Sequence, residues 1–355
     1  MGTGISRISL SVMALAAVVI IGAGVYLASQ PQSTPVSVVA GGASFPYPII
    51  TKWISEYNKL YPHIQISYQS VGSGAGQNNL FSKTFDFAGS DAPLRDDQLE
   101  KYNVIHIPET MGGVVVSYNI PGIGSGLKLT PDVIAKIFQG NITVWNDPEI
   151  SSLNPNLKLP DKGIVVVRRS DSSGTTYVFT SYLKDASPLW KLGAGTSVNW
   201  PVGLAAPQNS GVASVITQTP YSVGYLEFFY AHNNSIPYAA ILNKEGQFVM
   251  PSLETISNAA RAGASLLSKD VRASIVNLPG KDVYPISAFT YLLIYKDLSY
   301  MDYNKAKAVV NFIWWVIHDG QNYSEALLYP KLPTEVVKIG ENLLKQVTYQ
   351  GKPIL

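Results

Sequence analysis

The chain has 355 residues and a net charge of +2, from 26 basic and 24 acidic side chains; 46% of its residues are hydrophobic and 14% are charged. This balance excludes a disordered chain, and the lack of a basic surplus argues against broad electrostatic binding to nucleic acid. Because cysteine is absent, disulfides, thiolate metal sites, thiol nucleophiles and lipid attachment through cysteine are excluded too.

The first 35 residues have the pattern of a membrane-directed segment followed by a linker. Arg7 is the only charged side chain before Lys52, and Ile8–Ala28 is apolar apart from glycines and two serines. A membrane-spanning helix needs about 20 mostly apolar residues, whereas the apolar region of a cleaved signal peptide has about 7–15. The length therefore favours a retained N-terminal transmembrane anchor over a cleaved signal, with residues 29–35 as linker. Both interpretations place the rest of the chain outside the cytoplasm.

The next part of the chain alternates strand and helix patterns. Pro46 and Pro48 suit a helix start, and apolar residues then recur at helical spacing up to Leu60. The strands predicted around this helix cover 36–40, 64–71, 85–90, 104–107 and 113–118. Such alternation predicts a mostly parallel α/β sheet.

The second part continues with strands and helices. Thr130 is a good cap and Pro131 a good first residue for a helix. The predicted order is a loop at 119–126, a helix at 130–138, a strand at 164–167, a helix up to Leu183, strands at 225–227 and 286–295, and helices at 304–318 and 335–346.

Common enzyme motifs are missing from the sequence. No His-Glu-x-x-His, Gly-x-x-x-x-Gly-Lys-Ser/Thr or Gly-x-Ser-x-Gly run occurs, and Gly72–Gly76 lacks the third glycine of a dinucleotide-binding turn. The four histidines are scattered. Polar chemistry must therefore rest on carboxylates, hydroxyls, arginine and backbone amides.

Three short loops share a pattern that favours anion binding. Each places glycine and small hydroxyl residues between a predicted strand and a helix; they are Gly41–Pro46, Val71–Gly76 and Ser170–Thr176. A helix N-terminus offers unpaired N–H groups, glycine lets the backbone approach an anion, and Ser or Thr adds a donor. In an open α/β sheet such loops lie at the carboxyl ends of strands, where ligands bind. For any one loop, an ordinary helix cap is the alternative.

Two charged groups accompany these loops. Arg169 ends a strand just before the third loop, and its guanidinium can bind two oxyanion oxygens at once. A surface ion pair with Asp171 is the alternative, although Asp171 could also hold Arg169 in a binding orientation. Asp91 would repel an anion unless the anion carries a proton to donate, as phosphate does near neutral pH and sulfate does not. The alternative for Asp91 is a turn or helix cap.

These residues resemble the substrate-binding protein of bacterial and archaeal phosphate ABC transporters. The similar stretches are, in order, Gly41–Pro46, Val71–Gly74, Asp86–Pro93, Gly112–Val116, Val166–Thr176 and Val223–Tyr225. The resemblance implies an α/β fold of the two-lobed type II periplasmic-binding-protein kind, with two mixed-sheet lobes joined by two hinge strands. The implied boundaries are 36–117 with 287–355 for lobe I, and 118–286 for lobe II.

The resemblance also implies the ligand contacts. Ser44, Ser73, Ser173, Gly174 and Thr175 would surround the anion, with the hydroxyl groups and the N–H groups at the helix start as donors. Phe45 would add a backbone N–H, Asp91 would accept the ligand's proton, Arg169 would clamp oxygens, and Asp171 would orient Arg169. Two features depart from the family pattern: Ser44 stands where threonine is more frequent, and no cysteine is available for a lipid anchor.

The sequence therefore predicts an extracytoplasmic, monomeric receptor for inorganic phosphate that serves an ABC importer through its permease subunits. We expect it to be anchored by the N-terminal helix or secreted, and to be neither an enzyme, nor dependent on a cofactor or metal, nor a nucleic-acid-binding protein. Two alternatives stay open: a receptor for another oxyanion, such as sulfate or molybdate, and a phosphatase that uses Ser44 or Ser173 as nucleophile.

Overall fold

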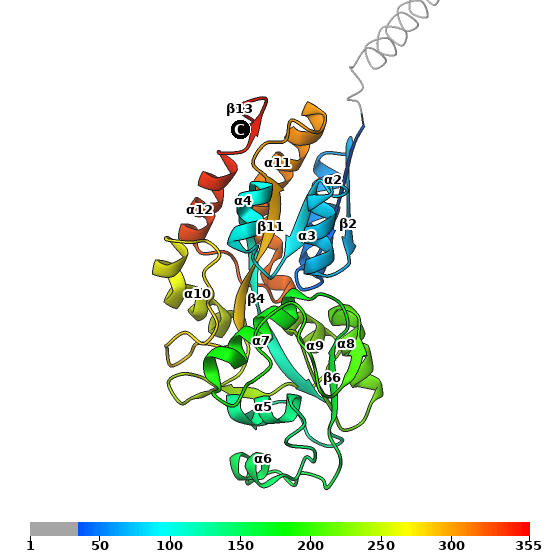
Figure 1. The fold of residues 1–355 in the computed structure, drawn as a ribbon, viewed down its shortest axis with the longest axis vertical. Helices are drawn as coiled ribbons and strands as arrows, with labels where there is room; N and C mark the ends of the chain where they lie inside the picture. The colour runs from blue at the N-terminus through cyan, green and yellow to red at the C-terminus, as the bar shows by residue number, and fades with distance from the viewer. Residues whose placement is uncertain (1–34) are drawn as a thin grey trace, which may run out of the picture. The chain divides into compact units, whose positions relative to one another are not determined.

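The computed structural model describes residues 35–355, of which Val36–Leu355 form one compact unit (Figure 1). The predicted N-terminal anchor falls on residues that lie outside the described part of the chain. Between residues 35 and 355, no helix combines the length and the apolar character needed to cross a membrane.

A mixed eight-stranded sheet forms the centre of this unit. In spatial order its strands are β2 (Ile64–Ser70), β1 (Val36–Gly42), β3 (Phe87–Ser90), β11 (Ser287–Tyr295), β4 (Val104–Tyr118), β8 (Ser222–Glu227), β6 (Val165–Arg169) and β7 (Leu204–Ala206). The two outer groups, β2-β1-β3 and β8-β6-β7, are parallel, whereas β11 and β4 run antiparallel to their neighbours. The sheet is thus more mixed than simple strand–helix alternation predicts, because β11 comes from the far end of the chain.

Strand β4 is shared by both halves of the sheet. Its residues Val104–Gly113 pair with β11, and Val114–Tyr118 pair with β8. The prediction of two separate strands here is wrong, since one strand of 15 residues covers both. Pro108 lies inside it, where the ladder with β11 shifts register and leaves Glu109 without an opposite residue. Proline is tolerated at such an irregularity.

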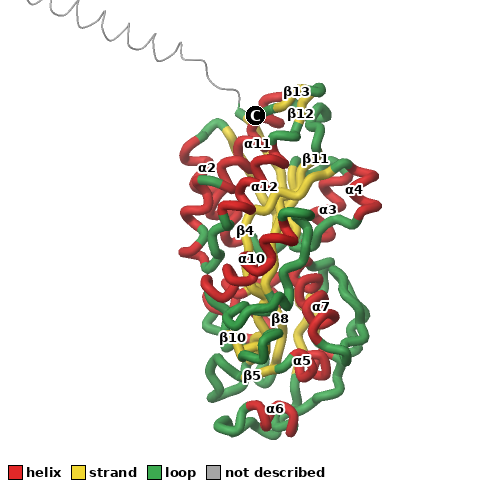
Figure 2. The backbone as a smooth tube through the Cα atoms, turned by 90° about the vertical axis from the view of Figure 1, so that its left-hand side faces the viewer, coloured by secondary structure: helices red, strands yellow, loops and turns green. Residues whose placement is uncertain are grey.

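Helices pack around both halves of the sheet (Figures 1 and 2). They are α2 (Tyr47–Leu60), α3 (Ser73–Phe81), α4 (Asp96–Tyr102), α5 (Pro131–Phe138), α6 (Pro148–Leu153), α7 (Gly174–Ala186), α8 (Gln208–Gln218), α9 (Phe228–Asn233), α10 (Leu253–Leu267), α11 (Tyr303–Ile317) and α12 (Thr334–Leu344). Helices α2, α3, α11 and α12 pack with β2, β1, β3 or the first part of β4, while α7 and α8 pack on β8 and β6. The expected two-lobed α/β architecture is confirmed.

Smaller elements complete the fold. They are a three-stranded sheet of β10 (Phe248–Val249), β9 (Ala240–Leu242) and β5 (Lys128–Leu129), a hairpin of β12 (Thr348–Tyr349) and β13 (Lys352–Pro353), and 3₁₀ turns at Asp319–Tyr323 and Glu325–Leu327. The lobe boundaries expected from the sequence, 117/118 and 286/287, fall at the end of β4 and just before β11.

Local chemistry explains where the elements that carry the predicted loops begin and end. Gly42 ends β1 with φ +143°, and a Cβ at this position would lie 2.1 Å from the carbonyl oxygen of Gly89 on β3. Only glycine allows this close approach. Ser173 caps α7, its Oγ accepting from the N–H of Thr176 at 3.1 Å. Strand ends and helix starts are thereby held close together around the three loops.

Candidate anion-binding site

The three predicted loops lie against one another. The first loop follows β1, and its Gly42 carbonyl accepts hydrogen bonds from the N–H groups of Val71 and Gly72 in the second loop, each at 2.9 Å. In turn, the N–H of Gly74 donates to the carbonyl oxygen of Ser172 in the third loop at 3.0 Å. Loops that are far apart in the sequence therefore meet at one place, and α2, α3 and α7 begin from it.

Ser44 and Thr175 are joined through a residue that the sequence analysis missed. Asn209 donates to Ser44 Oγ from its backbone N–H at 3.1 Å and from Nδ2 at 2.9 Å. The same Nδ2 donates to Thr175 Oγ1 at 3.1 Å. All three residues are buried, so the hydroxyl groups of the first and third loops face each other across this amide.

Ser73, Asp91 and Gly174 form the adjoining part of the cluster. The backbone N–H of Asp91 donates to Ser73 Oγ at 3.2 Å. A Cβ on Gly174 would lie 2.4 Å from both Asp91 Oδ2 and Ser73 Oγ. The start of α7 is thus in close contact with residues from the second loop and the end of β3.

Arg169 is a buried group rather than part of a surface ion pair, with only 3% of its surface exposed. Its Nε donates to Asp171 Oδ1 at 2.8 Å and its Nη2 donates to Asp171 Oδ2. Its Nη1 donates to Thr175 Oγ1 at 3.2 Å. Burial raises the pKa of Asp171, but hydrogen bonds and charge from Arg169 outweigh it and leave that pKa below its usual range. The carboxylate therefore stays charged and fixes the guanidinium.

Asp91 is the unusual electrostatic feature of the cluster. It is 3% exposed, and its Oδ1 has no hydrogen-bond partner among the described residues. Burial raises the pKa of Asp91 to about 7, although the nearby positive charge of Arg169 opposes this shift. A buried acceptor without a donor is unfavourable by about 1–3 kcal/mol. A ligand that brings a proton to this oxygen would remove that penalty.

Two other predicted site residues have clear structural roles of their own. Phe45 is buried, and its carbonyl oxygen accepts from the hydroxyl of Tyr329 at 2.7 Å. Ser173 Oγ accepts the capping hydrogen bond of α7 described above, so its hydroxyl proton can still be donated elsewhere. Neither contact conflicts with a ligand role, and the helix cap at Ser173 is the alternative that the sequence left open for that loop.

Helix α8 also begins at the cluster, and the sequence analysis did not predict it. Besides Asn209, the N–H of Gln208 donates to Asp171 Oδ1 at 3.0 Å. The buried residues Val212, Ala213 and Ile216 give this helix an apolar stripe at helical spacing. That short stripe after Pro207 was the available signal.

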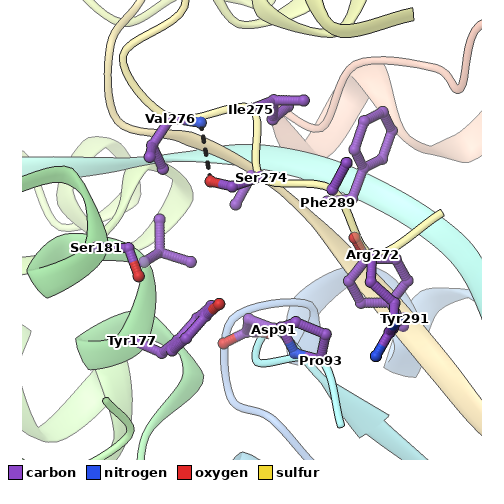
Figure 3. A pocket seen from close by; sticks show the side chains of 13 residues that line it. Asp91, Pro93, Tyr177, Ser181, Arg272, Ser274, Ile275, Val276, Phe289 and Tyr291 are labelled. Carbon is purple, nitrogen blue, oxygen red and sulfur yellow. Dashed lines mark hydrogen bonds between the residues drawn. The ribbon is translucent and has the colours of Figure 1, made fainter. Parts of the chain in front are cut away.

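Asp91 also borders a small pocket outside this cluster (Figure 3). Tyr177 and Ser181 of α7 line one side, and Phe289 and Tyr291 of β11 line another. The space open to water is about 20 Å³, which suits one water molecule. It is too small for a tetrahedral oxyanion, so an anion is better placed among the loops.

Gly174→Ala is expected to weaken anion binding about tenfold or more, because a methyl group at 2.4 Å from Asp91 and Ser73 would force these groups apart. Calorimetric titration with phosphate measures the effect. Gly124→Ala is the matched control, since a Cβ there has no atom within 4 Å, and its dissociation constant should equal that of the unmodified chain. Equal affinity for the Gly174 variant would contradict this prediction.

Comparisons with known proteins show the family and the fold of the chain. The model of the PBP superfamily domain matches residues 29–319. The chain is 40% identical to the phosphate-binding protein PstS of Pasteurella multocida, with 88% of this chain and 90% of that protein covered. It is also 40% identical to PstS of Methanocaldococcus jannaschii, with 90% and 89% covered.

A solved structure shows the same fold at lower identity. An ABC-type phosphate transport receptor from Vibrio cholerae is 20% identical, has a TM-score of 0.56, and is matched over 83% of this chain and 100% of that one. Family model and relatives both extend over most of the sequence. The chain therefore belongs to the PstS phosphate-binding proteins of the PBP superfamily.

Proposed function

We propose that this chain is a receptor that binds inorganic phosphate outside the cytoplasm and delivers it to an ABC importer. The observation that carries the proposal is the buried Asp91, whose Oδ1 has no hydrogen-bond partner among the described residues. Phosphate near neutral pH still has a proton for this acceptor, and sulfate does not. The names of the relatives, all phosphate-binding proteins, point to the same ligand.

The proposed contacts surround one tetrahedral anion. The hydroxyl groups of Ser44, Ser73, Ser173 and Thr175 and the N–H groups of Phe45, Gly174 and Thr175 donate, Arg169 clamps oxygens, and Asp91 accepts. Asp171 holds Arg169 in place. Hydrogen bonds to charged groups contribute about 1.5–3 kcal/mol each, so several of them in a dry site can reach micromolar affinity or better after the costs of binding.

The chain is a binding protein and not an enzyme. The phosphatase alternative needs a base beside Ser44 or Ser173. Ser44 Oγ instead accepts from the amide of Asn209, and Ser173 Oγ accepts from the N–H of Thr176. Two of the described histidines have partners elsewhere: His106 accepts from the N–H of Leu94, and His318 Nε2 lies 2.9 Å from Glu341 Oε1. Neither serine is therefore activated as a nucleophile.

Transport follows from movement of the two lobes in this proposal. Lobe I comprises 36–117 and 287–355, and lobe II comprises 118–286, with β4 and the segment that enters β11 as hinge strands. Ligand would favour the closed arrangement, which the permease subunits recognise. We propose further that the receptor is monomeric and either anchored by its N-terminal helix or secreted.

Calorimetric titration of the full chain with phosphate, arsenate, sulfate and molybdate tests the proposed function. Phosphate and arsenate should bind with micromolar affinity or better at pH 8, where Asp91 is ionised and these two anions still carry a proton, and sulfate and molybdate should bind at least about 100-fold more weakly because they bring none. Tight sulfate or molybdate binding with weak phosphate binding would favour the other oxyanion receptors. Turnover of p-nitrophenyl phosphate above background would favour the phosphatase.

A further inference from the structure

Asn209 makes four hydrogen bonds at the centre of the cluster, and their geometry fixes the orientation of its side chain. Its Oδ1 accepts from the backbone N–H of Glu227 at 3.0 Å. Because a backbone N–H can only donate, the oxygen must face Glu227, and the two hydrogens of Nδ2 must face Ser44 and Thr175. The residue has no exposed surface, so water does not compete for these bonds.

This orientation limits what the Ser44 hydroxyl can do. A hydroxyl oxygen has two acceptor sites and one proton. Ser44 Oγ accepts from the backbone N–H and from Nδ2 of Asn209. Both acceptor sites are filled by groups that cannot accept in return, and the proton of Ser44 must be donated to another atom.

The same count applies to Thr175. Its Oγ1 accepts from Arg169 Nη1 at 3.2 Å and from Asn209 Nδ2 at 3.1 Å. Its proton must likewise be donated elsewhere. One amide thus sets the donor state of two hydroxyls that come from separate loops, the first before α2 and the second at the start of α7.

We infer that Asn209 is a positioning residue that turns the hydroxyls of Ser44 and Thr175 into obligatory donors toward the anion. This inference rests on the proposed function. Without Asn209 each hydroxyl could rotate and present a lone pair, which repels an anion. The site would then bind less well an anion whose ionised oxygens face these hydroxyls and whose protonated oxygen faces Asp91.

A double-mutant cycle separates this role from a purely structural one. Asn209→Leu in the otherwise unmodified full chain should raise the calorimetric dissociation constant for phosphate roughly tenfold or more. In a chain that already carries Ser44→Ala and Thr175→Val, the same Asn209→Leu change should raise it less than about threefold, because the hydroxyls through which it acts are gone. Equal factors in both backgrounds would overturn the inference, as would an unchanged dissociation constant in the first.

Asn119→Leu is the structural control. Asn119 donates from Nδ2 to the carbonyl oxygens of Ile216 and Thr217 at the other end of α8, so its loss should lower the melting temperature and leave phosphate affinity unchanged. If Asn209→Leu does not fold, Asn209→Ala replaces it in the cycle. If the proposed function is wrong, the unmodified chain itself does not bind phosphate, and the inference about Asn209 is then wrong as well. If only the inference is wrong, the unmodified chain binds phosphate and Asn209→Leu has the same effect in both backgrounds.

Discussion

Arg169→Ala is expected to weaken phosphate binding by about 2–5 kcal/mol, a factor of roughly 30 to several thousand. The guanidinium is buried and has its Nε and Nη2 on Asp171 and its Nη1 on Thr175. Its removal leaves the carboxylate of Asp171 without a counter-charge close to an anion, so repulsion adds to the lost contacts. Calorimetric titration of the variant with phosphate at pH 7 measures the loss.

Two further variants show whether the loss belongs to this guanidinium. Arg168→Ala changes the neighbouring arginine, which is half-buried and whose side chain donates to the carbonyl oxygen of Arg169; the affinity of this variant should stay close to that of the unmodified chain. Arg169→Lys keeps the charge and loses the planar fork, so its affinity should be intermediate. If Arg169→Ala bound phosphate as tightly as the unmodified chain, Arg169 would not belong to the site.

The local parts of the fold were predictable because they depend on neighbouring residues. The helix expected from Pro46 to Leu60 corresponds to α2, and Thr130 caps α5 through a hydrogen bond from the N–H of Val133 at 3.2 Å. The three hydroxyl loops were recognisable because the same pattern of glycine and small hydroxyl residues recurs at three strand-to-helix junctions, although each loop alone could be an ordinary helix cap. Their meeting at one place follows from the rule for carboxyl ends of strands.

Other parts depend on contacts that no local pattern encodes. Asn209 donates to Ser44 although the two residues are 165 positions apart in the sequence. No local sequence pattern around either residue predicts this hydrogen bond. Glu109 and Glu227 are fully buried acids, although glutamate is usually exposed. Burial raises the pKa of Glu109 to about 8 and that of Glu227 well above its usual value. The burial of these two acids can be recognised only once the arrangement of the surrounding strands is known.

The buried acids have a consequence for the stability of the ligand-free protein. Burial raises the pKa of Asp91 from 3.8 to about 7, so the folded chain holds a proton there that the unfolded chain has lost between these pH values. The stability associated with Asp91 is therefore fully present below pH 4 and is lost as the pH rises through 7. Asp91 alone accounts for a decrease of up to about 4 kcal/mol, and Glu109 extends the decrease toward pH 8.

Asp91→Asn is therefore expected to change selectivity and stability in opposite directions. The amide can donate to a fully ionised oxyanion and carries no repelling charge, so the preference for phosphate over sulfate should fall roughly 10- to 100-fold. The free energy of unfolding without ligand should rise at pH 8 and change little at pH 4, because a charged group is no longer buried. Competition calorimetry measures the first effect, and urea unfolding at both pH values measures the second.

Asp97→Asn is the control for both measurements, because Asp97 is an exposed acid paired only with Arg95; neither selectivity nor the stability difference between pH 4 and 8 should move appreciably. If the Asp91 variant rejects sulfate as strongly as the unmodified chain does, Asp91 is not the acceptor that selects a protonated anion. The opposite signs of the two effects are the informative part, since simple damage to the fold would lower affinity and stability together. If the Asp91 variant is more stable and also discriminates less between phosphate and sulfate, the buried carboxyl lowers stability and serves to select the ligand.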